Sequence, residues 1–314
     1  MTASLVACGP GTSKSSRTTR SVPVLRGGAA ELPAFDASQS AGLFVGVRKF
    51  QDDPELREVP FAVDDAVDLA YRFALEVSPP LIPAERVVLA LAGEPQKTES
   101  TARLEALLAA GARRGDAFPS DIRDWLKEQS MAAGEAGLLV VAFATHGLKQ
   151  RQWEYLLTTS SRGSYIPDTS VGVHTVMSAV GKSPAWRRLV LLDACRDNRK
   201  PGSRSPVNGK RLELDEALAA EGQVVLAARP YAVLYDDPLR GQGVFTAAVL
   251  DGLTCRGPLA EDGSVTVEEL ANHVDATVAK WESKRAAVPG ERSRGGISRT
   301  IDGSMGRFRL VTCP

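Results

Sequence analysis

The sequence lacks several features that would assign it to common classes of protein. None of its apolar stretches reaches the roughly 18 residues that a membrane-spanning helix needs. Lysine plus arginine and aspartate plus glutamate both number 38, so the overall charge gives no indication of nucleic-acid binding. The first apolar run, LFVGVRKF, is not followed by a glycine-rich phosphate-binding loop. A membrane span, a nucleic-acid partner and a nucleotide-binding domain are therefore all disfavoured.

Cysteine and histidine are scarce. The cysteines are Cys8, Cys195, Cys255 and Cys313, and the chain has three histidines. No two cysteines form a CxxC pair and the histidines do not cluster with them, so we expect no structural zinc site. Cys255 and Cys313 either pair as a disulfide in an oxidising compartment or are free thiols in a cytoplasmic protein. Both alternatives stay open.

The first 40 residues are predicted to be a flexible leader or tether, followed by one folded domain over residues 41–314. Gly, Ser, Thr and Arg dominate the stretch GPGTSKSSRTTRSVPVLRGG, which has no apolar period. Residues 5–9, LVACG, are similar to a bacterial lipoprotein cleavage box in which Cys8 would carry the lipid. The seven residues before Cys8 supply neither a basic start nor an apolar region. Either the match is chance, or the true start lies upstream and a truncated signal occupies residues 1–8.

Short apolar runs alternate with helical patterns along the rest of the chain. Continuous apolar runs are typical of strands that are buried on both faces of a parallel sheet. The sequence therefore predicts an α/β fold, with a mostly parallel six-stranded sheet and helices on both faces. The expected strands are 43–47, 86–91, 137–143, 188–192, 223–228 and 307–311; the expected helices are 61–77, 98–114, 119–132, 171–180, 243–253 and 266–280; and long loops are expected at 196–215 and 284–305.

A thiol and an imidazole follow two of these apolar runs. His146 ends GLLVVAFATHG and Cys195 follows RRLVLLDA, about 50 residues later. Because active sites of parallel sheets gather at the carboxyl ends of the strands, we expect Cys195 to be a nucleophile and His146 its general base. The amides of Gly147 and Cys195 would bind the oxyanion. The alternatives are a buried structural cysteine and a hydrogen-bonded loop histidine. His174 and His273 lie in predicted helices and are interpreted as ordinary packing or surface residues.

Taken together, these motifs resemble the caspase-like cysteine peptidases, closest to the metacaspase and bacterial caspase-homologue branch. The resemblance runs from Leu43 to about Lys280 and rests on LFVGV, AVDDA, a strand followed by His-Gly, a strand followed by DAC, GQGVFTAAVLDGL and DGSVTVEEL. It implies a three-layer sandwich and a cysteine-type endopeptidase with protein substrates, and its chemistry needs no cofactor. A catalytically silent interaction or signalling module of the same fold is the alternative.

The resemblance also implies a preference for basic side chains. Animal caspases have Gln-Ala-Cys at the nucleophile, whereas this chain has Asp193-Ala194-Cys195. In metacaspases the matching Asp binds a basic side chain together with an Asp of the first helix. That match implies that Asp193 and Asp65 form an acidic pocket that selects Arg or Lys, and Coulomb attraction agrees with it. Asp64 is the alternative to Asp65, and both acids also suit the start of a helix.

Two further expectations concern regulation. The 196–215 loop is rich in Arg and Lys, so it is either a solvated basic loop or a site of self-cleavage of the kind that caspase-like enzymes undergo. Metacaspases often need calcium, and the acidic pairs Asp236-Asp237 and Glu261-Asp262 are candidates for its ligands. No EF-hand spacing is present, and the sequence leaves calcium activation open.

Overall fold

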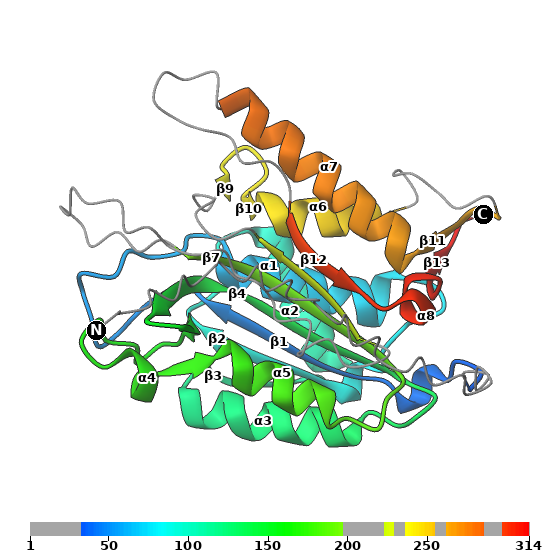
Figure 1. The fold of residues 1–314 in the computed structure, drawn as a ribbon, viewed down its shortest axis with the longest axis horizontal. Coiled ribbons are helices and arrows are strands. Elements are labelled where there is room, and N and C mark those ends of the chain that lie inside the picture. Colours follow the sequence, from blue (N-terminus) through cyan, green and yellow to red (C-terminus); the bar gives the residue numbers. More distant parts are fainter. Residues whose placement is uncertain (1–32, 197–222, 229–235, 255–261, 286–296, 314) are drawn as a thin grey trace, which may run out of the picture. The chain divides into compact units, whose positions relative to one another are not determined.

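The fold is built on one central sheet. The structure, a computed structural model, describes residues 33–196, 223–228, 236–254, 262–285 and 297–313. The main path of the sheet runs in the order β12-β8-β7-β4-β1-β2-β3 (Figure 1). Neighbouring strands pair in parallel, except that β12 is antiparallel to β8. The strands are β1 (Ala41–Val47), β2 (Val87–Ala92), β3 (Arg113–Asp116), β4 (Leu138–Gln150), β7 (Arg187–Arg196), β8 (Gln223–Ala228) and β12 (Ile297–Ile301).

The prediction of six strands is wrong, because the main sheet has nine within the described residues. Two short strands, β5 (Trp153–Leu157) and β6 (Ser170–Gly172), extend it in antiparallel fashion beyond the end of β4. The strand β3 begins at the end of the stretch that we assigned to a helix, and β12 lies in a stretch that we assigned to a loop. The predicted last strand, β13 (Arg309–Thr312), pairs instead with β11 (Ser264–Thr266) in a separate two-stranded sheet.

Helices cover both faces of the sheet, as predicted (Figure 1). One face carries α1 (Ala62–Tyr71), α2 (Thr98–Ala109), α6 (Val244–Gly252) and α7 (Val267–Arg285). The other carries α3 (Pro119–Ala132) and α5 (Val173–Gly181). The described elements also include two short helices, α4 (Ile166–Thr169) and α8 (Gly303–Gly306), and a short hairpin of β9 (Asp236–Asp237) and β10 (Gln242–Gly243). Three further helical turns, η1 (Ala37–Gln39), η2 (Arg72–Glu76) and η3 (Ala84–Arg86), lie between the larger elements.

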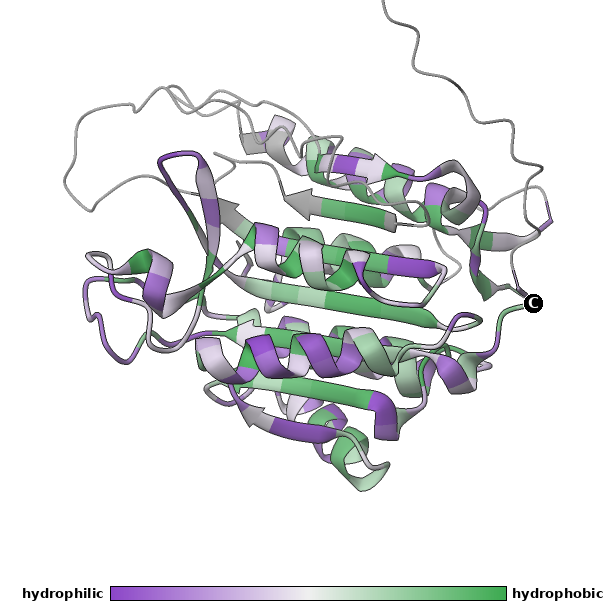
Figure 2. Cartoon of the chain, turned by 60° about the horizontal axis from the view of Figure 1, so that its bottom comes forward, coloured by the Kyte–Doolittle hydropathy of each residue, from purple (hydrophilic) through white to green (hydrophobic). Residues whose placement is uncertain are grey.

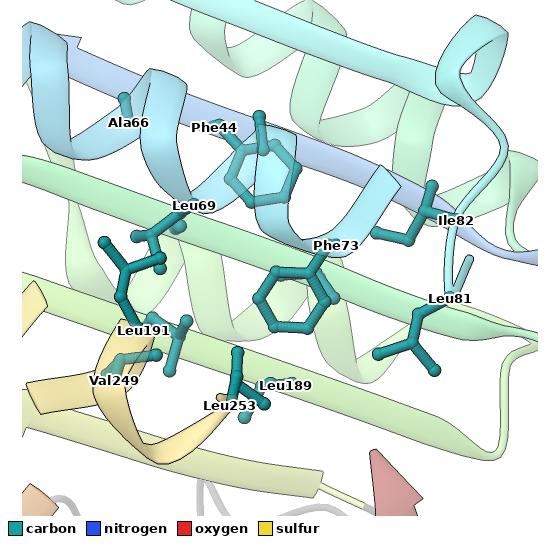
Figure 3. Packing of buried hydrophobic residues seen from close by; sticks show 14 of the residues in the cluster. Phe44, Ala66, Leu69, Phe73, Leu81, Ile82, Leu189, Leu191, Val249 and Leu253 are labelled. Atoms are coloured by element: carbon teal, nitrogen blue, oxygen red, sulfur yellow. The ribbon is translucent and has the colours of Figure 1, made fainter. Parts of the chain in front are cut away.

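The alternation of side chains along the strands creates two apolar cores. On β7, Leu189 and Leu191 pack toward α1 and α6, whereas Val190 and Leu192 pack toward α3 and α5. Figure 2 shows the central strands as hydrophobic along most of their length. Figure 3 shows the first core, in which the ring of Phe44 on β1 lies 6.2 Å from that of Phe73. Burial on both faces explains why these strands read as continuous apolar runs.

The two ends of the described chain are attached to the domain. Residues 33–40, which we assigned to the tether, contact it: Arg187 donates to the carbonyl of Pro33, and the ring of Phe35 lies 5.0 Å from that of Phe308. Cys313 is disulfide-bonded, which excludes a free thiol there. Pairing with Cys255, which lies outside the described residues, stays a prediction. Within the described part of the chain, no helix is long and apolar enough to cross a membrane.

Candidate active site

His146 and Cys195 lie side by side in the sheet. The strands β4 and β7 run in parallel, and their register pairs the Cα of His146 with that of Cys195. Neighbouring strands are about 4.8 Å apart, so the two backbones are adjacent. Both residues lie within strands rather than after them, because β4 continues to Gln150 and β7 to Arg196. Pairing with β5 explains the extension of β4.

The imidazole of His146 is held in a defined orientation. Its Nε2 atom lies 2.9 Å from the backbone carbonyl oxygen of Arg57. A carbonyl only accepts hydrogen bonds, so Nε2 carries the hydrogen and the neutral ring presents Nδ1 as its acceptor nitrogen. The ring also stacks on Phe50, with centroids 5.3 Å apart. The half-buried His146 is therefore fixed by two contacts from the loop that follows β1.

Gly147, which follows His146, lies in the sheet, whereas the two other histidines of the chain lie in helices. Gly147 is buried and lies in register with Arg196 on β7 and with Leu156 on β5. His174 begins α5, and its exposed ring lies 4.9 Å from that of Trp153. His273 lies on α7 against Gly252 of α6. Both of these histidines are in helices, as predicted, and the role of the Gly147 amide stays a prediction.

Asp65 and Asp193 come together around Gly243, and we call them the acidic pair. Both are buried. The amide of Gly243 donates to the two carboxylate oxygens of Asp65 at 3.2 and 3.1 Å. The amide and hydroxyl of Thr246 donate to Oδ2 of Asp193 at 3.1 and 2.8 Å. Asp65 reaches this position because α1 packs closely on β1: a Cβ on Gly46 would lie 2.6 Å from the carbonyl oxygen of Ala62.

The two other acids of α1 bind elsewhere. Asp64 accepts hydrogen bonds from the amides of Gln96 and Lys97, at 2.9 and 2.8 Å, so it holds the loop before α2. Asp68 forms ion pairs with Lys97 and Arg103, at 2.6 and 3.0 Å, and accepts from the side chain of Gln242. Of the two alternatives left open by the sequence, Asp65 is therefore the one that lies beside Asp193.

The surroundings of Asp65 disfavour its charged form. Burial raises the pKa of Asp65 well above its usual value, and the negative charge of Asp193 raises it further. The hydrogen bond from the Gly243 amide and the positive charge of Lys97 act in the opposite direction. Asp68 adds a smaller repulsion. The acidic pair therefore stores unfavourable electrostatic energy, as is common at functional sites.

We expect the free energy of unfolding of Asp65→Asn, relative to that of the wild type, to increase as the pH rises. A carboxyl whose pKa is raised by folding binds its proton more tightly in the folded state. Its stabilising contribution is complete below the pKa of the unfolded chain and is lost as the pH rises through the raised pKa. Asparagine does not titrate and still accepts from Gly243. The free energies of unfolding of the two proteins are measured by urea denaturation between about pH 5 and pH 8. The difference should move in favour of the variant toward the higher pH.

Asp64→Asn is the matched control for that measurement. It changes the neighbouring residue of the same helix, but it weakens charge-assisted bonds to the amides of Gln96 and Lys97. We expect a loss of about 1 kcal/mol and no gain at higher pH. If the two variants show the same dependence on pH, the surroundings of Asp65 do not cause the change in the stability of the protein.

Two of the acids that we named as candidate calcium ligands have partners within the protein. Asp237 accepts from the amide of Leu239 within its own turn, and Asp262 binds Ser264 and Arg309. Among the described residues, no group of three or more His, Cys, Asp or Glu side chains could hold a metal ion. Glu261 and the 197–215 part of the basic loop lie outside the described residues. Activation by calcium stays a prediction.

Several residues of this region carry no signal in the sequence. Phe50 and Arg57 lie in a loop without periodicity, and Arg57 acts through its backbone carbonyl. Gly243 and Thr246 belong to the segment GQGVFTAAV, which the family resemblance includes without giving it a role. The hydrogen bonds from this segment to the acidic pair are visible only in the structure.

Comparisons with known proteins agree with this architecture. The family model of the caspase domain matches residues 114–297, more than half of the sequence. The chain belongs to the caspase domain family. Its structure is similar to caspase-1 from Spodoptera frugiperda, with a TM-score of 0.51 at 14% identity, covering 86% of this chain and 89% of that one. Pro-sf-caspase-1 gives 0.50 at 12% identity, covering 88% and 94%. No curated protein sequence matches the chain.

Membership of the caspase domain family supports a cysteine-type peptidase, a hydrolase whose substrates are proteins. The structural neighbours confirm the predicted caspase-like arrangement of a mostly parallel sheet between helices. The assignment to the metacaspase branch stays a prediction.

Proposed function

We propose that the protein is a cysteine endopeptidase that cleaves peptide bonds after Arg or Lys, with Cys195 as nucleophile and His146 as general base. The observation that carries the proposal is the direct register of these two residues on adjacent parallel strands. Residues in register on neighbouring strands project to the same face of a sheet. We therefore expect the thiol beside the imidazole whose Nε2 is occupied by the carbonyl of Arg57.

The proposed reaction follows from this arrangement. Nδ1 of His146 takes the proton of the Cys195 thiol, and the thiolate attacks the carbonyl carbon of the peptide bond. Backbone amides, for which Gly147 and Cys195 are the candidates, bind the oxyanion. The tetrahedral intermediate collapses as His146 gives its proton to the leaving amine, which leaves a thioester. Water, deprotonated by the same imidazole, then hydrolyses the thioester and restores the thiol.

The acidic pair supports the preference for Arg or Lys. Two buried carboxylates close together attract a cation and repel an acidic side chain, so cleavage after Asp is disfavoured. The raised pKa of Asp65 supports the same preference, since a bound cation would relieve the repulsion that Asp193 exerts on Asp65. Asp193 also precedes Cys195 by two residues on β7, so that the residue selecting the side chain is next to the proposed nucleophile.

A panel of fluorogenic peptides tests the proposal. Peptides ending in Arg, Lys or Asp are incubated with the full chain and with Cys195→Ala, with and without calcium. We expect turnover of the Arg and Lys peptides that disappears in Cys195→Ala. Cleavage after Asp would overturn the role of the acidic pair. Absence of cleavage under every condition would favour the catalytically silent module.

We also propose that the active enzyme cleaves its own chain within the 196–215 loop. Support comes from composition: Arg and Lys are frequent there, and they match the specificity proposed above. Mass spectrometry after prolonged incubation should find new termini after basic residues of this loop in the wild type but not in Cys195→Ala. An intact wild-type chain would contradict self-cleavage.

A further inference from the structure

The aromatic ring of Phe50 covers one face of the His146 imidazole. The two rings are almost parallel, with an interplanar angle of 18° and centroids 5.3 Å apart. The side chain of Phe50 is buried. By contrast, the ring of His174 is tilted by 54° against that of Trp153, and both of these side chains are exposed. Phe50 is therefore placed to act on His146 through the face of its ring.

The position of Phe50 is fixed by its neighbours. The amide of Lys49 donates to the carbonyl of Ala92 at 3.3 Å, and the amide of Gln51 donates to the carbonyl of Thr159 at 2.7 Å. These bonds attach the backbone on either side of Phe50 to the end of β2 and to the residues after β5. The ring itself packs in the second apolar core, with α3 and α5. The imidazole of His146 therefore rests on a surface that cannot easily withdraw.

The loop also joins its two contacts with His146 into one unit. The amide of Val59 donates to the carbonyl of Arg48 at 3.0 Å, and the guanidinium of Arg48 forms an ion pair with Glu58 at 3.1 Å. These contacts close the base of the loop, between Phe50 on one side and Arg57 on the other. The carbonyl of Arg57 thus fixes the Nε2 edge of the imidazole while Phe50 fixes its face.

The imidazole becomes a cation during the proposed reaction. Nδ1 of His146 takes the thiol proton of Cys195, so that an S–H bond breaks, an N–H bond forms, and a thiolate and an imidazolium replace two neutral groups. The face of an aromatic ring is the negative part of its quadrupole and attracts a cation whose distance from the centroid is within about 6 Å. The 5.3 Å between the two centroids is inside this range.

We propose that Phe50 is a positioning residue of the active site, whose ring holds the imidazole of His146 by its face and stabilises the imidazolium that forms when Cys195 loses its proton. The inference rests on the proposed reaction of Cys195 and His146, and it adds a residue that acts through His146. If Phe50 only fills the core, another apolar side chain of similar size would serve equally well. If its ring stabilises a cation, the electrons of the ring matter.

Fluorination of the Phe50 ring tests this charge effect while the packing is conserved. Mono-, di- and trifluorophenylalanine at residue 50 withdraw electron density from the ring face step by step, with little change of shape. We expect kcat for the best basic peptide to fall with each added fluorine, by about 2- to 30-fold over the series. KM should stay unchanged, because the substitution acts on His146 and not on the peptide.

Substitutions separate the aromatic face from its apolar bulk. Phe50→Tyr keeps the face and should keep kcat close to that of the wild type, whereas Phe50→Leu should lower kcat at least as much as trifluorophenylalanine. Phe44→Leu is the matched control, since Phe44 is also buried and its ring lies 6.2 Å from that of Phe73 in the first core. It should lose stability and leave kcat unchanged. Equal losses of kcat in the two leucine variants would show that Phe50 acts by packing alone.

Nuclear magnetic resonance reports the stacking directly and needs no substrate. The chain has three histidines, so His146→Ala assigns the ring protons of His146. In the wild type, the ring current of Phe50 should shift these protons upfield from their positions in Phe50→Leu. The protons of His174 and His273 should not move. Equal shifts for His146 in the two proteins would overturn the positioning by Phe50.

The outcomes distinguish this inference from the proposed function. A kcat that does not respond to fluorination, together with full activity of Phe50→Leu, would overturn the role of Phe50 and leave Cys195 and His146 as the proposed pair. The rate at which iodoacetamide alkylates Cys195 at neutral pH, corrected for the rate in Cys195→Ala, should be lower in Phe50→Leu and lower still in His146→Ala. If His146→Ala reacts as fast as the wild type, the proposed function fails and this inference falls with it.

Discussion

Replacement of His146 by alanine is expected to lower kcat for the best basic peptide by about 100- to 10,000-fold, the range that a general base contributes. The hydrogen bond from Nε2 to the carbonyl of Arg57 sets the tautomer, so the ring can accept the thiol proton at Nδ1. Alanine removes both the proton acceptor and the donor to the leaving amine. His174→Ala is the control, because that histidine also contacts an aromatic ring but begins a helix on the surface; its activity should be unchanged.

A second measurement shows whether His146 acts on the thiol itself. The rate of alkylation of Cys195 is followed against pH, with Cys195→Ala used to subtract the other cysteines. A thiol paired with a histidine reacts at a pH below the usual thiol pKa of about 8.5. In His146→Ala, the midpoint of the plot of alkylation rate against pH should move toward that value. An identical curve in His146→Ala would mean that the imidazole does not activate Cys195.

The sequence predicted the central strands and helices because burial is what these elements share. β1, β2, β4, β7 and β8 are buried in the middle of the sheet, and their apolar runs are visible without a structure. The edge strands gave no such signal. Residues of β3 are Arg113, Arg114, Gly115 and Asp116, which form a strand because they pair with β2 and not because they are buried. β12 is likewise defined by its pairing with β8.

The candidate site divides in the same way. Cys195 and His146 stood out because reactive side chains follow apolar runs, and the structure places them in register. The sequence could not choose between Asp64 and Asp65, since adjacent residues of a helix point about 100° apart and the direction of the sheet relative to that helix was unknown. The contacts of Phe50, Arg57 and Gly243 depend on backbone atoms and ring stacking in segments that are distant in sequence, and such contacts leave no periodic pattern.

Asp193→Asn is expected to lower kcat/KM for Arg and Lys peptides by about 30-fold or more, since removing one charge from a buried ion pair costs about 2–5 kcal/mol. Asparagine keeps an oxygen that accepts from the amide and hydroxyl of Thr246, so the start of α6 stays attached to β7. The change therefore removes charge while conserving shape. Asp262→Asn, an acid that binds Ser264 and Arg309 near β11, is the control and should leave the specificity unchanged.

The same variant separates selection of a basic side chain from a purely structural role. If Asp193 only holds α6 through its bonds to Thr246, Asp193→Asn should affect basic and neutral peptides equally. If Asp193 selects the substrate, the melting temperature should hold while basic peptides lose their advantage over neutral ones. Combining it with Asp65→Asn sharpens the distinction. Two carboxylates that bind one cation depend on each other, so the double variant should lose less than the product of the two single losses. Strictly multiplicative losses would indicate that Asp65 and Asp193 do not bind the same cation.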